Sequence, residues 1–225
     1  IYKKFFQNEF SKQEFNLSSH NNIVFLVGFP RSGTTLLDSI LRTHSKTIVL
    51  EEKSFLLNIR HGFFKNKNIH ALNEISEKEI LVLQKKYYDQ ITDYNNEQSK
   101  IIIDKFPLNI IELGFIKTIF PKSKIILSLR HPCDVIISTF LTLFKMNDAM
   151  ANFFDIKTSA YLYNEVLELF EIYNDVFDLN CYKIKYENII IDFEKTINGL
   201  LNFLTLDYED KIEKFYETSK KRVKI

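Results

Sequence analysis

Short apolar segments alternate along this chain with stretches long enough to form helices. Five short segments are expected to be strands, and Ile, Leu and Val dominate the first four: 23–27, 47–50, 100–104, 124–129 and 181–185. Length and helical periodicity predict helices at 33–43, from 51, at 76–96, at 108–120, from 132, at 150–177 and at 193–204. Strands that alternate with helices of this length indicate a parallel sheet with helices on both faces. The expected fold class is α/β, a three-layer α/β/α domain with a central parallel sheet.

No repeat, low-complexity block or Pro/Gly/Ser-rich linker divides the 225 residues, and a chain of this length is ample for one core. We therefore expect a single domain over 1–225, in which 1–20 form an N-terminal extension, either a short packed helix or a linker. Hydrophobic residues make up 45% of the chain and aromatic residues 14%, which excludes a disordered chain. The formal net charge of +1 offers no basic surface for nucleic acid, so no nucleic-acid partner is expected.

The sequence also bears on the compartment. It contains no run of 18 or more apolar residues, so no transmembrane segment is expected. Cys133 and Cys181 can form one disulfide at most, which favours a reducing compartment. The expected location is therefore cytoplasmic.

A glycine-bounded loop follows the first predicted strand and opens the first predicted helix. Residues 28–35 read Gly-Phe-Pro-Arg-Ser-Gly-Thr-Thr. Gly28 and Gly33 let the backbone turn tightly, so that successive N–H groups and the helix N-terminus face one concavity that suits phosphate or sulfate. The spacing is that of a P-loop, but Thr34 stands where the P-loop lysine belongs, and Arg31 supplies a cation inside the loop. The loop predicts an anion site in a P-loop-like fold; the plainer alternative is that its glycines merely close a turn.

Segment 29–37 resembles the 5′-phosphosulfate loop of sulfotransferases that use 3′-phosphoadenosine 5′-phosphosulfate (PAPS). It is most similar to the tyrosylprotein and bacterial TPR-linked branch of that family. The resemblance implies an enzyme that moves a sulfuryl group from PAPS to a hydroxyl or amine acceptor and releases adenosine 3′,5′-bisphosphate (PAP), with no metal. Under this resemblance the 5′-phosphosulfate is bound by Arg31, Ser32, Gly33, Thr34 and Thr35.

A second candidate anion site follows the strand predicted at 124–129. Arg130 lies at the carboxyl end of that strand, where open α/β sheets bind ligands, and Ser138 lies eight residues on in the next helix. An arginine with a nearby hydroxyl can hold a phosphate dianion; alternatively, Arg130 pairs with Asp134 and Ser138 is an ordinary helix residue. Segment 129–138 resembles the 3′-phosphate segment of the family, which implies that Arg130 and Ser138 bind the 3′-phosphate.

Two charged positions are candidates for catalysis. Glu51 and Glu52 follow the second predicted strand and could simply be acids in the first turn of a helix. The family resemblance implies that Glu52 is the general base, with Glu51 as the alternative one residue away. Lys105, in Asp-Lys-Phe-Pro-Leu-Asn, is similarly implied to stabilise charge on the leaving phosphate oxygen; otherwise it is a solvated lysine after a strand.

Two weaker candidates lie near the C-terminus. Segment 184–188 resembles the Tyr-Glu-Asp segment of the family, which implies that the Tyr186 ring stacks on the adenine; otherwise the ring is half-buried structure. The basic tail 218–224 loosely resembles the start of a second cofactor loop, which makes Ser219 a candidate ligand. Because the sequence stops inside that loop, we expect the C-terminus to be truncated.

Two other functions remain open at this point. The first is a P-loop small-molecule kinase with Asp104 as its Mg²⁺ ligand, against which Thr34 counts. The second is a non-catalytic nucleotide-binding remnant. The sequence does not identify the acceptor, which could be a peptide tyrosine, a carbohydrate, a lipid or a small molecule, and it does not indicate an oligomeric state.

Overall fold

The computed structural model describes residues 1–13, 15, 22–94, 100–144 and 149–217, and its centre is a parallel five-stranded sheet. The strands are β1 (Ile23–Gly28), β2 (Thr47–Glu51), β3 (Ile101–Lys105), β4 (Lys124–Leu129) and β5 (Cys181–Lys185). Their order across the sheet is β2-β3-β1-β4-β5, and every neighbouring pair is parallel. All carboxyl ends therefore meet at one edge of the sheet.

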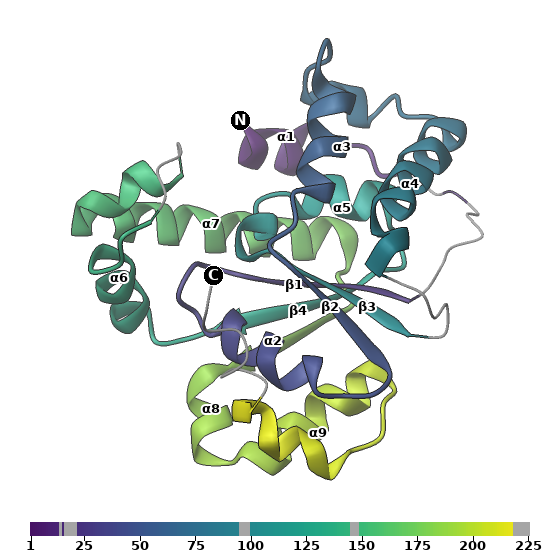
Figure 1. Ribbon diagram of the computed structural model, residues 1–225. Helices are drawn as coiled ribbons and strands as arrows, with labels where there is room; N and C mark the ends of the chain where they lie inside the picture. The colour runs from purple at the N-terminus through teal and green to yellow at the C-terminus, as the bar shows by residue number, and fades with distance from the viewer. Residues whose placement is uncertain (14, 16–21, 95–99, 145–148, 218–225) are drawn as a thin grey trace.

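Helices cover both faces of the sheet, which confirms the predicted three-layer α/β/α fold (Figure 1). One face carries α2 (Thr34–Arg42), α8 (Tyr186–Ile191) and α9 (Phe193–Leu204). The other carries α1 (Tyr2–Asn8), α3 (Phe55–Phe64), α4 (Glu77–Ile91), α5 (Leu113–Ile119) and α7 (Ile156–Phe177). Helix α6 (Pro132–Phe140) lies beyond the carboxyl ends of the strands, beside the start of α7. Among the described residues, no helix has the length and apolar composition to span a bilayer.

Alternation along the strands separates two hydrophobic cores. In β3, Ile102 belongs to the core under α4, α5 and α7, whereas Ile103 belongs to the core under α2 and α9. The next two residues continue this alternation, because Asp104 reaches α4 and Lys105 reaches α2. Adjacent charged residues of one strand are thus buried on opposite faces.

Several helix boundaries differ from the sequence prediction. The helix expected from residue 51 begins at Phe55, because Glu52 has a left-handed backbone (φ 47°) that interrupts any helix there. The helix expected over 150–177 is a 3₁₀ turn, Met150–Phe154, followed by α7, and extended Asp155 caps α7 by accepting hydrogen bonds from two backbone N–H groups.

Other predicted segments were also shortened, split or missed. The helix expected over 76–96 is α4, which ends at Ile91 before a 3₁₀ turn, Thr92–Tyr94. The helix expected over 108–120 is a 3₁₀ turn, Pro107–Ile110, followed by α5. Helix α8 was not predicted, nor were the 3₁₀ turns Ile69–Leu72 and Asp210–Lys214. Within the N-terminal extension, the described residues include the packed helix α1 rather than a linker alone.

Candidate functional site

The loop between β1 and α2 turns back sharply at the carboxyl edge of the sheet. Arg31 and Gly33 both have positive φ, 70° and 103°, and Ser128 on the adjacent strand donates a hydrogen bond to the Ser32 carbonyl at 2.8 Å. A Cβ added at Gly28 would lie 2.6 Å from Ser32 Oγ and 2.7 Å from the Ser128 carbonyl oxygen. The loop therefore needs glycine at position 28 for close packing and at position 33 for its backbone.

The same loop carries hydrogen-bond donors without intramolecular acceptors in the described part of the chain. Gly33 is the N-cap of α2, and no side chain caps this helix end, so the N–H groups of its first turn lack intrahelical acceptors. The Ser32 hydroxyl is buried and has no hydrogen-bond partner among the described residues. These groups, with the partial positive charge of the helix N-terminus, suit a phosphate or sulfate oxygen.

Lys105 ends β3 beside this loop, and its side chain is fully buried in a group of acids. Its Nζ lies 2.7 Å from Glu52 Oε1, 3.4 Å from Glu51 Oε1 and 3.8 Å from Asp38 Oδ2. The backbone N–H of Glu52 donates to the Lys105 carbonyl at 2.8 Å, which holds the end of β2 against β3. The structure thus brings Lys105 and Glu52 into direct contact, and Lys105 is not a solvated lysine.

Asp38, from the second turn of α2, completes this group and was missed by the sequence analysis. Its side chain is fully buried, and Arg42, one turn later, contacts its Oδ1 through Nε at 3.1 Å and Nη2 at 3.0 Å. A signal was present in the sequence, because Asp38 stands next to Leu37 within the apolar spacing of that helix. A carboxylate at such a position needs buried partners.

Arg130 and Tyr186 form the other side of the loop. The guanidinium carbon lies 4.7 Å from the centre of the Tyr186 ring, and Nη2 lies 3.6 Å from Asp134 Oδ2, the pairing considered as the alternative. Arg130 Nε is buried without a hydrogen-bond partner among the described residues. The Tyr186 ring also packs on the loop, because a Cβ at Gly33 would lie 2.9 Å from its Cδ2. Arg130 therefore keeps a donor available beside the loop.

Ser138 contacts the loop rather than Arg130. Its Oγ accepts a hydrogen bond from Arg31 Nε at 3.0 Å, which joins two residues predicted for different phosphate groups. Ser219 lies outside the described residues.

Asp104 points away from the loop. Its side chain is fully buried beneath α4, where the Tyr87 hydroxyl donates to its Oδ2 at 2.7 Å. Burial raises the pKa of Asp104 to about 7, against the lowering effect of that hydrogen bond. This placement does not fit the Mg²⁺-ligand role considered for Asp104.

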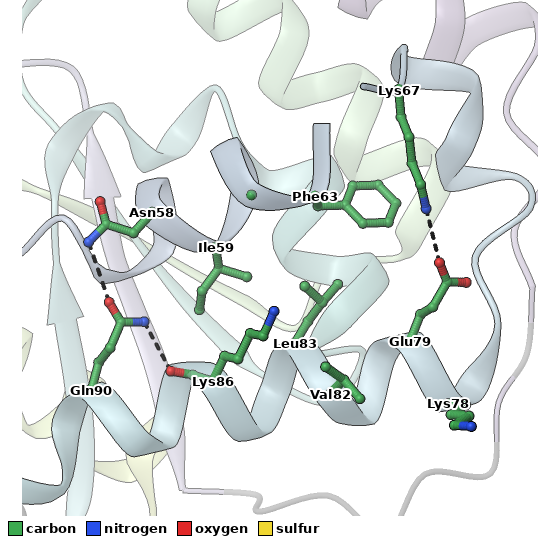
Figure 2. Close-up of a pocket in the computed structure, with 11 residues that line it drawn as sticks. Asn58, Ile59, Phe63, Lys67, Lys78, Glu79, Val82, Leu83, Lys86 and Gln90 are labelled. Atoms are coloured by element: carbon green, nitrogen blue, oxygen red, sulfur yellow. Dashed lines mark hydrogen bonds and ion pairs between the residues drawn. The ribbon is translucent and has the colours of Figure 1, made fainter. Parts of the chain in front are cut away.

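A cavity of about 600 Å³ lies elsewhere, between α3 and α4 (Figure 2). Ile59, Phe63 and Leu83 form its apolar wall, and Lys67 pairs with Glu79 at its rim. None of the predicted site residues lines it. The candidate site is therefore the group of residues at the strand ends and not this cavity.

The residues at the strand ends fit a phosphorylated nucleotide. The buried Ser32 hydroxyl and Arg130 Nε are donors without partners among the described residues, and both border the glycine loop. The Tyr186 ring lies in the same region, with the Arg130 guanidinium against one face, and aromatic rings stack on nucleobases.

Comparison with known proteins agrees with this chemistry. The model of the sulfotransferase family matches residues 23–210. An uncharacterized protein of Aquifex aeolicus is 28% identical over 207 residues, 88% of this chain and 27% of that protein. Protein-tyrosine sulfotransferase A of Caenorhabditis elegans is 25% identical over 201 residues, 84% of this chain and 51% of that protein. The chain thus spans about half or less of the length of these relatives.

Solved structures share the fold. The sulfotransferase domain from the curacin biosynthetic pathway superposes with a TM-score of 0.60 at 18% identity, over 87% of this chain and 77% of that one. A mouse sulfotransferase, SULT7A1 complexed with PAP, gives a TM-score of 0.51 at 17% identity, over 92% of this chain and 68% of that one. At these identities the likeness concerns the fold.

Proposed function

The chain belongs to the sulfotransferase family, and we propose that it transfers a sulfuryl group from PAPS to a hydroxyl or amine acceptor. The observation that carries the proposal is the contact between Lys105, fully buried, and Glu52 at the strand ends beside the glycine loop. A cation and a carboxylate in contact there offer charge stabilisation and proton transfer in one place.

The donor, when bound, supplies an activated sulfuryl group on a phosphate that departs as PAP. In this proposal the α2 N-terminus and the loop hold the 5′ side, through Arg31, Ser32, Gly33, Thr34 and Thr35. Arg130 and Ser138 hold the 3′-phosphate, and Tyr186 stacks on the adenine. The mouse sulfotransferase in complex with PAP supports the nucleotide assignment by analogy. Arg31 and Ser138 bond to each other in the structure, so each would exchange that bond for one to phosphate.

Glu52 is the proposed general base. Its carboxylate takes the proton of the acceptor hydroxyl or amine while the acceptor atom bonds to sulfur and the bond from sulfur to the phosphate oxygen breaks. Lys105 stabilises the electron pair left on that phosphate oxygen. Glu52 is preferred over Glu51 because it lies closer to Lys105, at 2.7 Å against 3.4 Å, and Glu51 also faces Arg42 at 3.8 Å.

We propose a tyrosine-bearing peptide as the first acceptor class to test. The curated relatives with a named activity include protein-tyrosine sulfotransferases of Caenorhabditis elegans and Gallus gallus. Carbohydrate, lipid and small-molecule hydroxyls complete the screen, because the chemistry at Glu52 requires only a nucleophile beside the carboxylate.

The test is single-turnover transfer of ³⁵S from labelled PAPS to such acceptors, together with PAP binding in the presence of EDTA. Transfer with metal-independent PAP binding supports the proposal. Mg²⁺-dependent ATP binding without PAP binding would support the kinase alternative, and PAP binding without any transfer would support a non-catalytic remnant.

A further inference from the structure

We propose that Asp38 is a positioning residue, which holds the Lys105 ammonium at the strand ends while Glu52 gives up its contact to take a proton. The proposal rests on the proposed function and assigns a role to a side chain in the core of α2. Its starting point is the position of Asp38 within ion-pair distance of Lys105, at 3.8 Å.

The three acids around Lys105 differ in their exposure. The side chains of Glu52 and Glu51 are 56% and 41% exposed, whereas that of Asp38 is 0% exposed. Water can solvate and screen the two glutamates, so they can leave the ammonium at small cost. Asp38 has no such access to water.

Asp38 is also held in place from its other side. Arg42 contacts Oδ1 through two nitrogens, which leaves Oδ2 as the oxygen nearest Lys105. The same Arg42 guanidinium also reaches Glu51, at 3.8 Å. Arg42 therefore pairs with two of the three acids that surround Lys105. The carboxylate of Asp38 is thus fixed in direction as well as in charge.

The reaction removes one of the charges that Lys105 depends on. When Glu52 accepts the proton of the acceptor, its carboxylate becomes neutral, and the 2.7 Å contact with Lys105 is no longer an ion pair. Of the two carboxylates that remain, Glu51 at 3.4 Å is 41% exposed and also faces Arg42, whereas Asp38 at 3.8 Å is fully buried. A fully buried ammonium needs a counter-charge that stays in place. Asp38 supplies a counter-charge that does not take part in the proton transfer, so Lys105 stays charged and held at the strand ends.

The principal test is Asp38→Asn, which keeps the shape of the side chain and removes its charge. We expect kcat to fall on the order of 10–100-fold, as for a catalytic group displaced by about an ångström. The Kd of PAP, measured by calorimetry, should change less than about threefold, because the side-chain partners of Asp38 described above, Arg42 and Lys105, are not among the residues proposed to bind the nucleotide. Glu112→Gln is the matched control, since it neutralises a mostly buried carboxylate paired with Arg60 outside the site, and its kcat should stay at the wild-type value.

A double-mutant cycle with Lys105→Met separates positioning from a merely structural role. If Asp38 acts through Lys105, adding Asp38→Asn to Lys105→Met should lower kcat by less than about twofold. If the two effects multiply, or if Asp38→Asn alone keeps full kcat, the inference is wrong. Should Asp38→Asn fail to fold, Arg42→Met serves instead, because it frees Asp38 Oδ1; it should lower kcat several-fold in the wild type and not in the Lys105→Met background.

Failure of the proposed function gives a different pattern. In that case the wild type transfers no sulfuryl group, or Lys105→Met keeps full turnover. Loss of activity in Lys105→Met with no dependence on Asp38 would overturn only the positioning role.

Discussion

Asp104 and Lys105 are neighbours in β3, both side chains are fully buried, and their surroundings are opposite in kind. Lys105 meets three carboxylates on the α2 face of the sheet, at 2.7, 3.4 and 3.8 Å. Asp104, on the α4 face, accepts a hydrogen bond from the neutral hydroxyl of Tyr87, and its Oδ1 is buried without a hydrogen-bond partner among the described residues. One strand end thus carries two buried ionisable groups, one compensated by opposite charges and one not.

The difference shows what makes a buried ionisable group usable in chemistry. The three carboxylates around Lys105 offset the cost of burying its ammonium group at the strand ends. No cation among the described residues pairs with Asp104, and burial raises its pKa to about 7, so that the neutral acid is favoured in the fold below that pH. The compensated face is therefore the one on which we place the proposed chemistry, and Asp104 lies on the other face.

Glu52→Gln changes a residue of the compensated face, and it should lower kcat more than any other variant proposed here. It removes the proposed base, so we expect kcat to fall about 10²–10⁴-fold, the usual contribution of general base catalysis. The affinity for PAP should hold, since Glu52 contacts Lys105 rather than the glycine loop. Single-turnover transfer and calorimetry measure the two quantities. Glu51→Gln is the control, and a larger loss in that variant than in Glu52→Gln would exchange the two roles.

Lys105→Met removes the cation from the same face. We expect kcat to fall about 10²–10³-fold, as for the loss of a preorganised group that stabilises charge in the transition state. Steady-state kinetics on a variant whose thermal unfolding remains cooperative provides the measurement. Turnover within twofold of the wild type would mean that the buried cation is structural.

How far the sequence alone predicted this arrangement depended on the kind of signal. The apolar runs predicted the strands closely, and β4, β5 and α9 have the predicted bounds, because burial on both faces requires such runs. The predicted start of α3 was wrong, because Glu52 has a left-handed backbone. Glutamate usually favours a helix, so the residue type at position 52 did not indicate this conformation.

The residues of the candidate site were also predicted only in part. Lys105 and Glu52 were expected near the strand ends, and parallel topology brings them together. Asp38 was missed because ion pairs between a helix and the neighbouring strands depend on how the helix packs on the sheet. The contact of Ser138 with Arg31 instead of Arg130 depends likewise on the position of α6.

Asp104→Asn removes the titrating carboxyl of the uncompensated face, so it should change how the free energy of unfolding depends on pH. The pKa of this carboxyl is about 7 in the fold and 3.8 in the reference state. Between these values the folded chain binds more protons than the unfolded chain, so the contribution of Asp104 to the free energy of unfolding falls as pH rises.

The amide in Asp104→Asn does not titrate and still accepts from Tyr87. The stability of this variant relative to the wild type should therefore rise by roughly 2–4 kcal/mol between pH 4 and pH 8. Urea unfolding at both pH values measures the change. Asp89→Asn, which alters an exposed carboxylate on α4, is the control. A difference between Asp104→Asn and the wild type that does not vary with pH would show that Asp104 is ionised in the fold throughout.

Arg130→Ala extends the comparison to the next strand end, with the smallest expected effect. Arg130 resembles Lys105 in its place at a carboxyl end, but its acid partner, Asp134, lies 3.6 Å away and is 54% exposed. So weak a pairing leaves the guanidinium available to an anion, and Nε is a buried donor beside the loop.

Loss of the Arg130 side chain should weaken PAP binding by about 1.5–3 kcal/mol, the range for a hydrogen bond to a charged group. Calorimetry with PAP and with adenosine 5′-phosphate, which lacks the 3′-phosphate, gives the specific test. The loss should appear with PAP and nearly vanish with the second nucleotide, whereas equal losses for both would place Arg130 away from the 3′-phosphate.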